Sequence, residues 1–108
     1  MPKYIFAYHG GSHPETPEEG QAVMAAWRAW MGDIQASITD MGAPVGMSKT
    51  VSSNGVADDG GANPISGYTI VTAVDMDGAI ALAKGCPING SGGSVEIAEM
   101  MDMSMDGK

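Results

Sequence analysis

Alternation of side chains along three stretches of the chain predicts strands. In residues 3–9, aromatic side chains share one face and smaller ones share the other: Tyr4, Phe6 and Tyr8 against Ile5, Ala7 and His9. The same period recurs in residues 67–75 and 94–102. Residues 43–53 read as a further strand, which Asn54 and Gly55 end with a turn, because both residue types tolerate positive φ.

A spacing of three and four residues replaces the alternation after Pro17 and predicts a helix as far as about Asp40. Thr16 is suited to cap its first turn, and Glu19 stands where a capping box needs a carboxylate. The stripe that we expect to be buried is Val23, Trp27, Trp30, Ile34 and Met41. A second, shorter helix is predicted after Asp75, lined by Met76, Ala79, Ile80 and Ala83.

The order of these elements is βαββαβ, which predicts a ferredoxin-like α+β fold: an antiparallel sheet with both helices on one face. We expect the small aliphatic side chains to pack against the helices: Ile5, Ala7, Val71, Ala73, Val95 and Ile97. The face left bare then carries Tyr4, Phe6, Tyr8, Tyr68 and Ile70. Such an apolar face predicts a homodimer in which two sheets face each other, with a cavity between them.

Length and charge limit the number of domains and the classes of partner that the sequence allows. The 108 residues suit one domain, expected over residues 1–103, with residues 104–108 as a flexible C-terminal tail. A net charge of −8 disfavours binding to nucleic acid. No apolar stretch is long enough to cross a membrane or to act as a leader, so we expect a cytoplasmic protein with no membrane partner. The single cysteine, Cys86, cannot form an internal disulfide.

Candidate chemistry gathers where the first strand ends. His9 is the candidate general acid or base, since a strand end beside a loop is a place where a cleft can open. Candidate ligand-binding residues surround it: Tyr8, Gly10, Gly11, His13, Trp27 and Tyr68. The two glycines allow close approach to a ligand, and the nearby helix start favours a small anion.

Each of these candidates has a plainer structural interpretation. His9 can simply end a strand and bond to backbone, and Trp27 and Trp30 can be core or interface residues. His9 and His13 lie four residues apart, but Gly10 and Gly11 prevent a helix that would bring both rings to one metal. The sequence therefore predicts no metal and no cofactor, and Cys86 is better explained as a packed residue than as a nucleophile.

Several stretches together resemble the YCII-related and DGPF-domain proteins. These are "KYIFAYHGG", "WRAWMGDI", "MGAPVG", "GYTIVTAVDMDGAIALAKGCP" and "GGSVEIAEM", and they span nearly the whole chain. The resemblance implies a dimeric α+β barrel in a family mostly without an assigned reaction. Where YCII proteins proper carry a helix histidine, this chain reads Trp27-Arg28-Ala29-Trp30, and its loop "DDGGANPISGY" lacks the Asp-Gly-Pro-Phe signature.

Two functional hypotheses follow. In the first, a small molecule binds in a cleft between sheet, first helix and dimer partner, with acid–base chemistry of lyase, isomerase or hydrolase type at His9. Tyr8 or Tyr68 would assist in moving a proton. In the second, the protein is a non-catalytic accessory or interaction domain whose aromatic sheet face is a dimer interface. The sequence does not decide between an enzyme and a binding module, because no nucleophile, base and orienting group have a spacing that brings them together.

Overall fold

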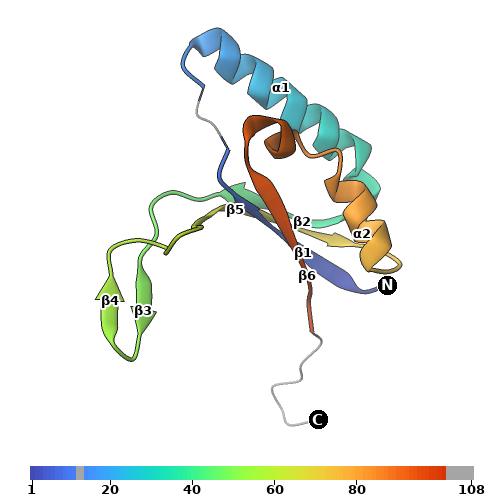
Figure 1. Ribbon diagram of the computed structural model, residues 1–108. Helices are drawn as coiled ribbons and strands as arrows, with labels where there is room; N and C mark the ends of the chain where they lie inside the picture. The colour runs from blue at the N-terminus through green and yellow to red at the C-terminus, as the bar shows by residue number, and fades with distance from the viewer. Residues whose placement is uncertain (12–13, 102–108) are drawn as a thin grey trace.

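The computed structural model describes residues 1–11 and 14–101 (Figure 1). The predicted tail, residues 104–108, lies outside them. The helices are α1 (Pro17–Asp33) and α2 (Met76–Ala83), with short 3-10 turns η1 (Gln35–Ser37) and η2 (Pro87–Ser91). The strands are β1 (Lys3–His9), β2 (Ile38–Pro44), β3 (Thr50–Ser52), β4 (Gly55–Ala57), β5 (Ile65–Thr72) and β6 (Ser94–Glu99).

Four strands form one antiparallel sheet in the order β2-β5-β1-β6. Figure 1 shows α1 and α2 together on one side of this sheet. Because each helix connects two strands that are not neighbours, the topology is the split βαβ arrangement of a ferredoxin-like fold. The prediction of an α+β fold with an antiparallel sheet and both helices on one face is confirmed.

Helix α1 begins at Pro17, as the sequence predicts. The amide of Glu19 donates to Thr16 Oγ1 at 3.1 Å, and the Glu19 carboxylate accepts from the amide of Glu15 at 2.8 Å. These two bonds satisfy backbone donors that an uncapped helix start would leave without partners. Helix α2 has the same kind of cap, with Asp75 Oδ1 accepting from the amide of Gly78 at 2.8 Å.

The far end of α1 differs from the prediction. The helix stops at Asp33, and β2 begins at Ile38, where a continuing helix and then a later strand were expected. Pairing with β5 decides this, because Ile38 lies opposite Val71 and packs against the core. Met41, predicted in the buried helical stripe, is 62% exposed in β2.

The assignment of the two sheet faces was wrong for β1. Tyr4, Phe6 and Tyr8 are buried beneath the helices, and the Phe6 ring stacks on Trp30 with 6.3 Å between centroids. The reason is complementary volume: the β5 residues on this face are small, and Phe6 lies opposite Thr69. Large rings on the central strand fill the space that these small neighbours leave under α1.

The face that no helix covers carries smaller side chains. Ile5 lies opposite Ile70 on one side and Ala98 on the other, and Ala7 lies between Tyr68 and Glu96. Opposite residues of an antiparallel pair point to the same face. We call this surface the uncovered face; it includes Ile5, Ala7, His9, Asp40, Tyr68, Ile70, Glu96 and Ala98.

Strands β3 and β4 form a separate two-stranded sheet that extends away from the main sheet, on the side opposite the helices (Figure 1). The chain departs after Val45, whose amide donates to the Ser66 carbonyl at 3.0 Å, and rejoins the sheet at Ile65. We call residues 46–61 the arm. The predicted strand over residues 43–53 is therefore divided between β2 and the arm. The turn lies one residue earlier than predicted, at Ser53 and Asn54, and Gly55, with a φ of 119°, is the first residue of β4.

Candidate functional site

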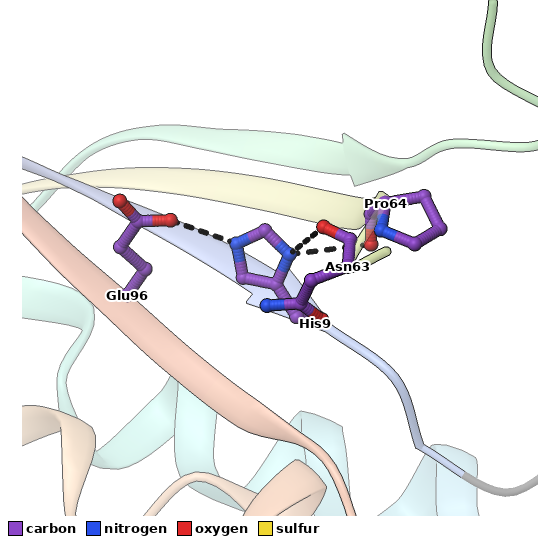
Figure 2. A network of polar contacts seen from close by, with 4 residues as sticks. All are labelled: His9, Asn63, Pro64 and Glu96. Atoms are coloured by element: carbon purple, nitrogen blue, oxygen red, sulfur yellow. Dashed lines mark hydrogen bonds and ion pairs between the residues drawn. The ribbon is translucent and has the colours of Figure 1, made fainter. Parts of the chain in front are cut away.

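The imidazole of His9 is hydrogen-bonded at both ring nitrogens (Figure 2). Nδ1 lies 3.0 Å from the Asn63 carbonyl oxygen and 3.2 Å from that of Pro64, and Nε2 lies 2.9 Å from Glu96 Oε1. Glu96 extends from β6, while Asn63 and Pro64 immediately precede β5. The pair of His9 and Glu96 thus lies on the uncovered face, at the end of β1.

The bonding pattern constrains the protonation of the ring. A carbonyl oxygen can only accept, so Nδ1 is the donor to Asn63 and Pro64, whereas the hydrogen between Nε2 and Glu96 Oε1 can be carried by either atom. Burial alone lowers the pKa of His9, but its hydrogen bonds to Glu96, Pro64 and Asn63 outweigh burial, and the pKa is raised. The raised pKa favours the protonated, positively charged form of His9.

The two partners differ in accessibility. The His9 side chain is 11% exposed and the Glu96 side chain 67% exposed. Glu96 Oε1 faces His9, while Oε2 has no hydrogen-bond partner among the described residues. The group that a ligand can reach is consequently the carboxylate, with the imidazole behind it.

Glu96 was missed by the sequence reasoning. Its alternation with Val95 and Ile97 already put it on the face opposite two core side chains. Combining that with the expected antiparallel pairing of β1 and β6 would have brought Glu96 near the end of the first strand. The exact register, Ala7 opposite Glu96, needed the structure.

Two predicted ligand-binding residues lie on the other face of the sheet, away from His9. Tyr8 is 5% exposed, donates its hydroxyl hydrogen to Thr69 Oγ1 at 2.7 Å, and meets the Trp27 ring edge-to-face at 5.1 Å. Burial raises the pKa of Tyr8 to about 12, and its hydrogen bond to Thr69 reduces this effect only in part. Tyr8 and Trp27 therefore serve the core in this structure.

The two predicted glycines lie against η2 and the turn that follows it. Gly10 and Gly11 have φ values of 72° and 93°, which glycine adopts without strain. A Cβ on Gly10 would lie 3.4 Å from Gly93 Cα, and one on Gly11 would lie 3.3 Å from the Ile88 side chain. The loop between η2 and β6 thus occupies the space beside them. His13 lies outside the described residues.

Tyr68 is the predicted residue that shares a face with His9. It belongs to the uncovered face, half-buried, and its hydroxyl lies 3.5 Å from Asp40 Oδ2. Ile5, Ala7 and Ile70 lie beside it as a half-buried apolar floor. This floor and the carboxylate of Glu96 together make an apolar surface with one polar end, the usual composition of a small-molecule site.

The hollows of the single chain lie elsewhere. A groove of about 420 Å³ follows the start of α1, with Pro14, Pro17, Val23 and Met24 in its walls, and another of about 520 Å³ lies near Met1 and Met100. Neither of these two grooves is lined by His9 or Glu96.

Other reactive groups in the described part of the chain do not join the pair. Cys86 is 3% exposed, and burial raises the pKa of its thiol to about 11, with a smaller opposing effect from a hydrogen bond to the Ile88 backbone. Within residues 1–11 and 14–101, no three or more His, Cys, Asp or Glu side chains are placed to hold a metal ion. In the same ranges, neither helix has the length and apolar character needed to cross a bilayer.

Comparison with known proteins shows a likeness in fold. A solved structure of 5-chloro-2-hydroxyhydroquinone dehydrochlorinase (TftG) from Burkholderia phenoliruptrix AC1100, in complex with 2,5-dihydroxybenzoquinone, matches with a TM-score of 0.56 and 14% sequence identity. The match covers 100% of this chain and 100% of that chain. No protein-family model and no curated protein matches the sequence. The chain therefore has the fold of this ligand-bound enzyme along its whole length. At 14% identity, the comparison supports a shared fold and no further property.

Proposed function

We propose that the protein binds a small hydroxyl- or N–H-bearing molecule on the uncovered face, at Glu96. The observation that carries this proposal is the pairing of an exposed carboxylate with a nearly buried imidazole, next to an apolar floor. The hydroxyl or N–H group of the ligand donates to Glu96 Oε2, and its apolar part lies against Ile5, Ala7 and Tyr68. The resemblance to YCII-related proteins is part of this proposal, and the fold of the structural neighbour is consistent with it.

The chemistry that this pair can perform is proton transfer. Glu96 takes a proton from the ligand, and the positive imidazole stabilises the carboxylate form when the proton is returned. Reactions of lyase, isomerase or hydrolase type need such a group. Nucleophilic chemistry has less support, because the Cys86 thiol is buried and the Tyr8 hydroxyl is bonded on the other face.

The name of the structural neighbour suggests which ligands to try first. That protein is called a dehydrochlorinase and was solved with a ring compound carrying two hydroxyl groups. A flat ring with a hydroxyl substituent also fits a floor of half-buried apolar side chains beside one acceptor. We therefore infer that hydroxylated rings are better probes for this chain than purely aliphatic acids.

The test is a calorimetric and NMR titration with catechol, 2,5-dihydroxybenzoquinone and pyruvate. Glu96→Ala should lose binding of the hydroxylated rings, while Glu99→Ala, which removes an exposed carboxylate from the same strand, should retain it. Equal affinity of both variants for every probe would show that Glu96 is not the site. A titration in which none of the three probes binds the unaltered protein would also count against the proposal.

A second candidate function has one specific observation in its favour. His9 Nδ1 is bonded to the Asn63 and Pro64 carbonyls, which is what a purely structural histidine at a strand end would show. In this reading the pair fastens the start of β5 to β1 and β6, and the protein is a non-catalytic interaction domain. His9→Gln should then lower the free energy of unfolding, and neither the unaltered protein nor this variant should bind the three probe molecules.

The homodimer belongs to this proposal. Tyr4 and Phe6, expected to drive it, are buried within one chain, so its support is now the uncovered face and the lack of a wall around Glu96. A second copy related by a two-fold axis would provide that wall and enclose the ligand between two sheets. Sedimentation equilibrium at micromolar concentration should give twice the mass of the chain, and a monomer would contradict this part.

A further inference from the structure

The two strands of the arm pair with no other strand of the described chain. All residues of β3 and β4 are exposed. An isolated two-stranded hairpin is at best marginally stable in water. Its side-chain support comes from within the arm and includes an ion pair, Lys49 Nζ to Asp58 Oδ1 at 2.9 Å, and a bond from Thr50 Oγ1 to the Asp59 carbonyl at 2.7 Å, beside turn bonds at Ser52 and Asp59.

One face of the arm is apolar. Val51 lies directly opposite Val56, so both side chains point to the same side, and they are 77% and 63% exposed. Thr50 and Ala57 form the neighbouring pair and point to the opposite side. At the beginning of the arm, Met47 is 99% exposed. The arm thus presents a small apolar surface with a defined direction.

The base of the arm lies at the candidate site. The chain leaving the arm passes through Asn63 and Pro64, whose carbonyls accept from His9 (Figure 2). From there the arm extends on the side of the sheet opposite the helices (Figure 1). The segment that joins the arm to β5 therefore borders the uncovered face at His9.

We propose that the arm packs its valine face against the uncovered face of a second copy of this chain. The valine face of the arm and the uncovered face both carry apolar side chains, and each copy has one of each surface. A two-fold axis therefore lets the arm of each copy pack against the uncovered face of the other. Each surface carries one ion pair, Lys49 with Asp58 on the arm and His9 with Glu96 on the uncovered face, which reduces the repulsion expected between two chains of net charge −8, although Asp59 and Asp40 each add one negative charge. The inference rests on the two-copy arrangement proposed above and adds that the arm supplies a wall of the ligand site in the other copy.

Two adjacent substitutions on opposite faces of the arm test this inference. Val56→Asp should raise the dissociation constant of the dimer by about tenfold or more, whereas Ala57→Asp should change it by less than about threefold. Both positions are exposed, so circular dichroism should show both variants folded. Sedimentation over a range of concentrations measures the constants. Equal effects of the two variants would overturn the inference.

Cross-linking shows where the arm lies. A photo-reactive benzoylphenylalanine replaces Val51, and unlabelled chains that carry it are mixed with heavy-isotope chains before illumination. Cross-links between light and heavy chains should map to the uncovered face, in peptides of β1, β5 or β6. Cross-links confined to single chains, in a protein that is nevertheless dimeric, would contradict the role of the arm. The effect of Glu96→Ala on catechol binding is measured separately. The proposed ligand site can therefore fail while the proposed packing of the arm holds, and the reverse.

Discussion

His9 and Glu96 have divided tasks, and the division follows from where each side chain lies. The imidazole is nearly buried and donates on both sides, so it positions and balances charge more than it meets a ligand. The Glu96 carboxylate is exposed, and its Oε2 atom has no hydrogen-bond partner among the described residues. At the level of single residues, we therefore propose Glu96 as the group that contacts a ligand and His9 as the positioning residue.

Stability should depend on pH through this pair. The pKa of His9 is raised in the folded protein above its ordinary value of 6.5. Its stabilising contribution is therefore complete below pH 6.5 and is lost as the pH rises through the folded pKa. Denaturant unfolding between pH 6 and 9 should show the unaltered protein losing stability relative to Glu96→Gln. A constant difference between the two, with Glu99→Gln as the control, would show that the pair is not charged.

Cys86 should be inert in the folded protein. With a thiol pKa of about 11 and 3% exposure, its thiolate is scarce at pH 8 and reagents cannot reach it. An aromatic disulfide reagent should react at the rate of unfolding, and at once after denaturant is added. Rapid reaction in native buffer would mean that the η2 region opens far more easily than its packing indicates.

Among the elements, α1 illustrates what local sequence can decide. Its start was predicted at about Pro17, where it is found, because Thr16, Pro17 and Glu19 act within one turn. Its end was not, because Ile38 is drawn into β2 by pairing with Val71, which is distant in sequence. The faces of β1 were assigned wrongly for the same reason: alternation separates Phe6 from Ile5 but does not say which side the helices cover.

The cap of α1 gives a quantitative expectation. Thr16→Ala should lower the free energy of unfolding by about 1 kcal/mol, since the amide of Glu19 loses its acceptor. Thr16→Ser keeps a hydroxyl at the same place and should cost much less. Urea unfolding of the three proteins measures the difference. Equal stability of all three would mean that the cap contributes nothing measurable.

For the whole molecule, neighbouring residues of β1 should report on different surfaces. Phe6 is fully buried under Trp30, so Phe6→Ala should destabilise each chain by about 3–5 kcal/mol. Ile5 is half-buried on the uncovered face, so Ile5→Ala should mainly weaken the dimer. Chemical unfolding and sedimentation separate the two effects. If Phe6→Ala weakened the dimer and Ile5→Ala destabilised the single chain, the aromatic rings of β1 would instead form the dimer interface.

The candidate site could be located from sequence only to the end of β1. His9 and Tyr68 were proposed because histidine and tyrosine stand out at strand positions, but the face that they share, and the burial of Tyr8 on the other face, depend on which side α1 packs. Glu96 joins His9 from β6, far along the chain, through a register that sequence pattern does not specify. Long-range pairing, more than residue type, was the missing information.

Binding of a small molecule on the uncovered face, at Glu96, can be mapped by amide and side-chain NMR shifts during titration with catechol, because alternate residues of β1 and β6 belong to opposite faces. We expect the largest shifts at Ala7, Tyr68 and Glu96 and a change in the His9 ring resonances. Shifts concentrated at Tyr8, Trp27 and Val95, with Glu96 and His9 unchanged, would place the ligand between sheet and helix and contradict this expectation.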